Sequence, residues 1–108
     1  MNINQKIETA FKDFGVTIAF LQYTGDAETY LTYYTWLEKP NLFFDDNYNT
    51  EVTYGTIDIF SKENFKDILT QVKKILKQNN FIWTDTAPET YDPDTGFFHV
   101  PVNFVQGE

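Results

Sequence analysis

The sequence contains neither cysteine nor arginine, and each absence excludes a class of protein. Without cysteine, a disulfide framework and a thiolate metal site are both impossible. Arginine is the usual bidentate contact to phosphate and to guanine, and sixteen acidic residues outnumber eight lysines, for a formal net charge of −8. Conventional binding to a nucleic-acid backbone is therefore disfavoured. Glycine-rich loops are missing too, which removes the usual phosphate cradle of a nucleotide cofactor.

Long hydrophobic runs are also lacking. The apolar runs are only a few residues long, so we expect no membrane-spanning segment and no membrane partner. Residues 1–7 do not have the charged-then-apolar layout of a signal peptide. Together with the missing cysteine, these features fit a cytoplasmic or a virion protein.

Aromatic residues, by contrast, are abundant. The 108 residues are 42% hydrophobic and 19% aromatic, with eleven Phe, seven Tyr and two Trp. This supply is ample for the core of one domain covering residues 1–108. It also exceeds what one small core needs, so we expect part of it to face a partner, where aromatic side chains supply rigid contact area.

Hydrophobic periodicity predicts two helices. The first covers residues 2–14, with apolar residues on one face of a 3.6-residue period and Gly15 as its stop. The second runs from a Ser61 N-cap, with Asn64 three residues further on, to about Asn79. Asn80 follows, a residue type that tolerates the left-handed conformation at a helix end.

Runs of β-branched and aromatic residues predict five strands, at 16–23, 30–37, 51–60, from Phe81 to a break at Ala87-Pro88, and at 97–105. Residues 91–96 are typical of a turn. The order α-β-β-β-α-β-β predicts an α+β fold with a mostly antiparallel sheet and both helices packed on one face. Residues 30–60 resemble a long hairpin with a mobile tip near 43–50.

The strand at 30–37 carries large residues on both faces, which predicts that both faces are covered. Tyr30, Tyr34 and Trp36 alternate with Leu31, Tyr33 and Leu37. One cover is the core, and the other is available to a partner. The interface candidates are the first three of these and the aromatic residues of the tip: Tyr30, Tyr34, Trp36, Phe43, Phe44 and Tyr48.

Three patterns are candidates for catalytic or metal sites. Asp94-Thr95-Gly96 matches the triplet of aspartic proteases, but Tyr-Asp-Pro precedes it and only twelve residues follow, so a turn is favoured. Asp92 with Asp94, and Asp45 with Asp46, lack the ligand number and spacing of a calcium loop. The single histidine, His99, lies in a strand. The only serine, Ser61, is expected to cap a helix. We therefore expect that the chain is not an enzyme and that it binds neither a metal nor a cofactor.

Three stretches resemble a known family. The sequence YLTYYTWLEKP at 30–40 is similar to a strand of the small neck and tail-completion proteins of long-tailed phages. The sequence YGTIDIFSK at 54–62, followed by Asn64-Phe65, resembles their junction into the second helix. The third stretch, NFIW at 80–83 with ETYDPDTGFFH at 89–99, resembles a segment of the same proteins that ends in Asp-Thr-Gly, two aromatic residues and His. The second and third together are the more specific, and the three follow one another in the family's order between residues 30 and 99.

This resemblance implies the tail terminator, or tail completion, family, which has the same element order. Members form a ring, typically a hexamer, on the end of a finished tail tube. The ring stops tube polymerisation and presents the tail to the connector of the head, and DNA passes through it. The implied partners are other copies of the chain, the tail tube protein and the head–tail connector, and the implied location is the virion.

A ring needs heterologous contacts between two different surfaces of each subunit. The lysines at 62–77 and the acidic last third of the chain are candidates to meet between neighbours. An acidic lumen would repel DNA and let it slide, so the candidate channel-facing residues are Asp45, Asp46, Asp92 and Asp94.

Two other interpretations stay open at this level. A head-closure or head–tail joining protein of the neck has a similar size and also forms rings. An acidic inhibitor that mimics DNA would also be small and have a net charge of −8, although its carboxylates should lie along one face, whereas here several gather in turns.

Overall fold

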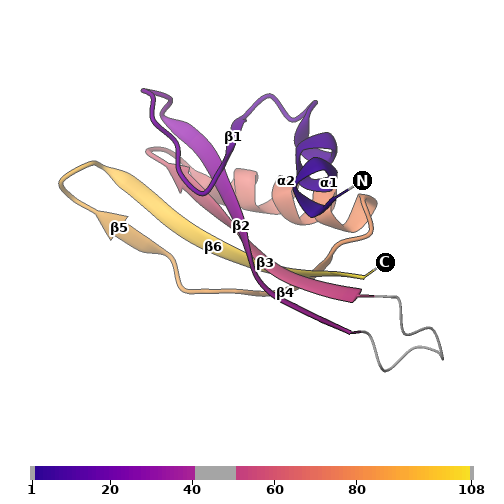
Figure 1. Cartoon of the computed structure of the whole chain (residues 1–108). Helices are drawn as coiled ribbons and strands as arrows, with labels where there is room; N and C mark the ends of the chain where they lie inside the picture. The colour runs from indigo at the N-terminus through magenta and orange to yellow at the C-terminus, as the bar shows by residue number, and fades with distance from the viewer. Residues whose placement is uncertain (1, 41–50, 108) are drawn as a thin grey trace.

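The computed structural model describes residues 2–40 and 51–107, and it confirms the α+β class, with two helices on one side of a mostly antiparallel sheet (Figure 1). Phe43, Phe44 and Tyr48, together with Asp45 and Asp46, lie outside the described residues. The elements are α1 (Ile3–Phe11), β1 (Thr17–Phe20), β2 (Thr29–Pro40), β3 (Glu51–Ser61), α2 (Phe65–Gln78), β4 (Ile82–Thr86), β5 (Thr90–Asp92) and β6 (Phe97–Gly107).

The sheet is built around three long strands. Its order is β1-β2-β3-β6-β4, and the short strand β5 pairs with β6 beside β4. All pairs are antiparallel except β1 with β2, which are parallel, with Thr17 opposite Tyr30 and Phe20 opposite Tyr33. The connection between them must therefore carry the chain back along β1. Neither this parallel pair nor β5 was expected from the sequence.

Helix α1 begins with a reciprocal cap. The Asn2 side chain accepts a hydrogen bond from the Gln5 backbone N–H at 2.9 Å, and the Asn2 backbone N–H donates to Gln5 Oε1 at 3.0 Å. The helix ends at Phe11, three residues earlier than expected. Gly15, which has a positive φ of 83°, then turns the chain into β1.

The prediction that Ser61 caps α2 is wrong. Ser61 is the last residue of β3, and its buried hydroxyl lies 3.1 Å from Thr29 Oγ1. Asn64 caps the helix instead, since its side chain accepts from the Lys66 N–H at 2.9 Å. The helix closes as expected, because Asn80 has a positive φ of 67° and the Phe81 N–H reaches back to the Leu76 carbonyl at 2.9 Å.

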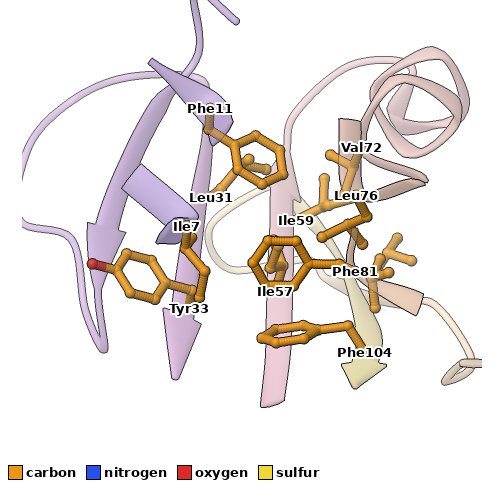
Figure 2. Close-up of a cluster of buried hydrophobic side chains, with 12 residues drawn as sticks. Ile7, Phe11, Leu31, Tyr33, Ile57, Ile59, Val72, Leu76, Phe81 and Phe104 are labelled. Atoms are coloured by element: carbon orange, nitrogen blue, oxygen red, sulfur yellow. The ribbon is translucent and has the colours of Figure 1, made fainter. Parts of the chain in front are cut away.

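The core fills the space between the two helices and one face of the sheet (Figure 2). Ile7 and Phe11 of α1 and Val72 and Leu76 of α2 meet the inward residues of β2, β3 and β6 there. The fully or nearly fully buried members are Ile7, Phe11, Leu31, Tyr33, Ile57, Ile59, Val72, Leu76, Phe81, Val100, Val102 and Phe104. Both helices therefore cover one face of the sheet. Within residues 2–40 and 51–107, neither helix covers the other face.

Candidate functional site

The face of the sheet turned away from the helices, which we call the open face, is covered by neither helix. Strand alternation places every second residue on it, and the register aligns these residues in rows across the strands. Its residues are Thr17 and Ala19 from β1; Tyr30, Thr32, Tyr34, Trp36, Leu37 and Lys39 from β2; Val52, Tyr54, Thr56, Asp58 and Phe60 from β3; Ile82 and Asp85 from β4; Thr90 and Asp92 from β5; and Phe97, His99, Pro101, Asn103 and Val105 from β6.

A β-bulge in β2 changes one expected orientation. The pairing of β2 with β3 shifts between Thr35 and Leu37, so that Leu37 lies opposite Tyr54 rather than on the core face with Leu31 and Tyr33. The sequence-based prediction that Leu37 shares a face with Leu31 and Tyr33 is therefore wrong. Because the extra residue breaks strict alternation, Trp36 and Leu37 are presented next to each other, 50% and 43% exposed.

One row of the open face is apolar across four strands. Leu37 of β2 lies opposite Tyr54 of β3, Tyr54 lies opposite Val105 of β6, and Val105 lies opposite Ile82 of β4. Ile82 is 63% exposed, and Trp36 extends the row because its ring packs on that of Tyr54 at 5.5 Å. We call these five residues the apolar row. Such a band is unusual on the solvent side of an antiparallel sheet, which is ordinarily polar.

The neighbouring row is a chain of hydrogen bonds. The indole N–H of Trp36 donates to Thr56 Oγ1 at 3.0 Å, and the Thr56 hydroxyl donates to Asn103 Oδ1 at 2.7 Å. The Asn103 amide then donates to Asp85 Oδ1 at 3.2 Å. These bonds connect side chains of four strands beside the apolar row, and a hydrogen-bonded network of this kind restricts the rotamers of its members.

Towards the other end of the strands, the open face carries a row of rings. Tyr30 stacks on Phe60 at 4.8 Å, and Phe60 stacks on His99 at 4.5 Å with the two rings parallel within 1°. Tyr23 packs on Tyr30 at 4.6 Å, and Phe97 meets it edge-on at 5.4 Å. Burial raises the pKa of the Tyr30 hydroxyl, and the nearby Tyr23 adds to the shift.

Two cavities flank this row of rings and share Tyr30, Phe60 and His99 as walls. The smaller, of about 240 Å³, lies towards the Leu21–Tyr23 segment and Asp58. The larger, of about 350 Å³, we call the Asp92 cavity. It is lined by Tyr30, Phe60, Thr90, Tyr91, Asp92, Thr95, Phe97 and His99.

His99 bonds to a residue that the sequence did not connect with it. Its Nε2 lies 2.8 Å from Asp58 Oδ1, with the two side chains 36% and 14% exposed. Asp58 is 41 residues earlier in the chain, and only the β3–β6 register, which sets Phe60 opposite His99, reveals the proximity. Within residues 2–40 and 51–107 no serine or threonine hydroxyl bonds to this imidazole, so the pair lacks the nucleophile of an acyl-transfer site.

The Asp94-Thr95-Gly96 triplet lies in an exposed turn, as expected. The Asp94 N–H donates to Asp92 Oδ1 at 3.0 Å, the Gly96 N–H donates to the Asp92 carbonyl at 2.7 Å, and Gly96 has a positive φ of 79°. Asp92, at the end of β5, lines the larger cavity, whereas Asp94 does not. The triplet is therefore not a buried carboxylate dyad.

Within residues 2–40 and 51–107, no three His, Asp or Glu side chains gather in a way that would hold a metal ion. Neither of the two helices there is long and apolar enough to cross a membrane. Comparison with known proteins adds no relative, since neither a protein-family model nor a curated protein matches the chain.

Proposed function

We propose that this chain is a structural protein of a phage virion that forms a ring on the end of the tail tube, stops tube polymerisation and joins the tail to the head. The observation that carries the proposal is the open face. It presents an apolar row of exposed side chains and a row of stacked rings, a surface suited to protein contact.

The segments that resemble the tail terminator family support the same interpretation. The first, at 30–40, is β2 with its bulge, the second leads from β3 into α2, and the third contains the start of β4, β5 and the start of β6. Together they supply much of the open face and the residues of β5 and β6 that line the Asp92 cavity. Sequence likeness thus coincides with the surface available for assembly.

A ring requires that each subunit present two different surfaces. The open face is one, and Tyr30, Tyr34 and Trp36 stay candidate interface residues on it. The exposed lysine-bearing side of α2, on the opposite side of the sheet, is a second (Figure 1). The exposed Asp94 carboxylate is our candidate, among the described acids, for the DNA channel, where negative charge repels the passing DNA.

The test is a tube-polymerisation assay with the purified chain and the tail tube protein of the same phage. We expect the chain to stop elongation and to be visible by electron microscopy as a ring at one tube end. Tubes that lengthen at the same rate with and without the chain, and carry no additional density, would contradict the proposal.

The same preparation separates the terminator from a neck protein of the head. A head-closure protein binds DNA-filled heads through the connector and leaves tube growth unchanged. Sedimentation of the chain with isolated heads, but not with isolated tubes, would therefore move the assignment to the neck.

A further inference from the structure

We propose that the Asp92 cavity receives a lysine side chain from α2 of a second copy of this chain, which forms a head-to-tail contact. This inference rests on the proposed ring and names the two surfaces that would meet in it. The cavity suits an organic cation, and α2, which carries four of the eight lysines, lies on the opposite side of the sheet, so the two surfaces join different copies.

The cavity has the composition of a cation site. Tyr30 and Phe97 present rings at 75° to each other, and Phe60 continues the aromatic wall. The lining contains one carboxylate, that of Asp92, and its other polar groups are the hydroxyls of Thr90, Thr95, Tyr30 and Tyr91 and the imidazole of His99. Aromatic faces attract ammonium groups through their quadrupole, and a carboxylate beside them adds charge attraction. An ammonium group on an apolar stem fits these walls better than an anion or a neutral apolar group does.

The chain itself shows that its rings accept ammonium groups. In the described part, Lys62 Nζ lies 5.1 Å from the centre of the Phe97 ring, one of the cavity walls. Lys73 Nζ lies 4.0 Å from the ring centre of Trp83, and Lys39 Nζ lies 5.2 Å from that of Tyr54. The same chemistry can therefore operate between copies.

The chain's own cations are concentrated on α2. Lys66, Lys74 and Lys77 are exposed there, on a helix whose other side packs Val72 and Leu76 into the core. Helix α2 lies on the core side of the sheet, opposite the open face of its own subunit (Figure 1), and Lys66 and Lys74 are exposed on it. Lys77, near the end of the helix, lines a hollow with Ile82 and Trp83 at the β4 edge. The α2 lysines cannot enter their own Asp92 cavity, but they can enter that of a neighbour.

A contact between different surfaces on opposite sides of a subunit is heterologous, which is the type that propagates into rings. Charge complementarity favours it locally, although two copies with a net charge of −8 repel at long range. At about 0.15 M salt the screening length is roughly 8 Å, so the repulsion between whole chains is damped more than a contact pair inside a cavity. The contact should therefore be studied near that salt concentration.

The absence of cysteine permits a direct experiment. A single Gln71→Cys substitution on the exposed side of α2 takes a nitroxide label at one position only. The labelled protein is mixed with ¹⁵N-labelled wild-type protein at millimolar concentration and about 0.15 M salt, where even weak association is recorded as paramagnetic broadening. We expect broadening at the amides of Thr90, Tyr91, Asp92 and His99. No broadening there, or broadening centred on α2 itself, would overturn the proposal.

Two matched variants test the acidic half of the contact. In the ¹⁵N-labelled partner, Asp92→Lys should weaken the association about tenfold, as expected for loss of one close charge pair. Asp94→Lys makes the same charge change two residues away, outside the cavity lining, and should leave the broadening unchanged. Equal effects of both substitutions would show a general charge effect and overturn the assignment to the cavity.

The basic half has its own control. Changing Lys66, Lys74 and Lys77 to Gln in the spin-labelled protein should remove the broadening. Changing Lys6, Lys12 and Lys39 to Gln yields the same net charge and should preserve it, and equal losses would contradict a specific contact. Normal tube capping without cavity broadening would overturn this inference alone, whereas broadening without tube capping would overturn the tail terminator proposal alone.

Discussion

The Tyr33 hydroxyl is the one polar end of a side chain that is otherwise completely buried in the core (Figure 2). It donates to Glu8 Oε1 at 2.7 Å. Burial raises the pKa of Tyr33 above its ordinary value of 10.0, and the hydrogen bond to the Glu8 carboxylate and the repulsion from its charge raise it further. In the folded chain the hydroxyl therefore stays protonated at a pH where it ionises in the unfolded chain.

This shift predicts a loss of stability at high pH. The stabilisation that depends on a protonated Tyr33 is fully present below the unfolded pKa of about 10, and it falls as the pH rises above that value, because the unfolded state then binds fewer protons. Tyr33→Phe should cost about 1 kcal/mol at pH 8, and this deficit should shrink by pH 11. Urea unfolding of both proteins across this range is the measurement, and parallel pH profiles would contradict the prediction.

Gly55 is required by the space around it. An added Cβ would lie 2.6 Å from Phe104 Cζ and 2.7 Å from the Tyr34 carbonyl oxygen, which belongs to the backbone and cannot move aside. Gly55→Ala should therefore lower the free energy of unfolding by about 1–3 kcal/mol. Gly107→Ala is the control, because nothing lies within 4 Å of its Cβ position, and unfolding curves of the two variants should separate clearly. Equal midpoints would refute the steric explanation.

At the scale of elements, the local sequence pattern could not decide which residue caps the start of α2. Serine and asparagine are both good N-cap residues, and Ser61 and Asn64 are three residues apart. The strand decides between them: β3 pairs through Ser61 with Thr29 of β2 and Phe98 of β6, so the chain stays extended until after Ser61. Long-range pairing of this kind is not visible in a local pattern.

The corrected cap is itself testable. Asn64→Ala removes the acceptor of the Lys66 N–H and should cost about 1 kcal/mol. Glu63→Ala alters the adjacent exposed side chain without touching that bond and should change stability by less than about 0.5 kcal/mol. Thermal unfolding followed by circular dichroism compares the two, and an equal loss in both would show that Asn64 is not the cap.

The candidate site was likewise only partly predictable from the sequence of the strands. Alternation and composition were sufficient to predict the two helices, the long strands and an aromatic face that includes Tyr30, Tyr34 and Trp36. They were not sufficient to predict which strands pair, and so the Asp58–His99 contact and the Asp92 cavity were missed. The bulge at Trp36 was missed as well, because it depends on how β2 pairs with β3. One inserted residue reverses the alternation that a period-2 pattern assumes, and Leu37 therefore lies on the open face.

At the scale of the whole molecule, the chain is asymmetric. Both helices cover one side of a sheet, and the other side combines an apolar row with aromatic cavities. A solvated sheet face normally gains little from exposed isoleucine, leucine and tryptophan, which increase the risk of aggregation. Their presence in one row that crosses β2, β3, β6 and β4 is more consistent with a surface that another protein covers.

Ile82 is the best position at which to test this surface. It is 63% exposed at the end of the apolar row, on β4 at the margin of the sheet, so Ile82→Lys should change the free energy of unfolding by no more than about 0.5 kcal/mol. If the row contacts the tail tube or a neighbouring subunit, the buried lysine charge should reduce tube capping at least tenfold at equal concentration. Thr24→Lys adds the same charge at an exposed turn away from the row and should cap normally. Capping by the Ile82 variant at the wild-type concentration would show that the apolar row lies outside every assembly contact.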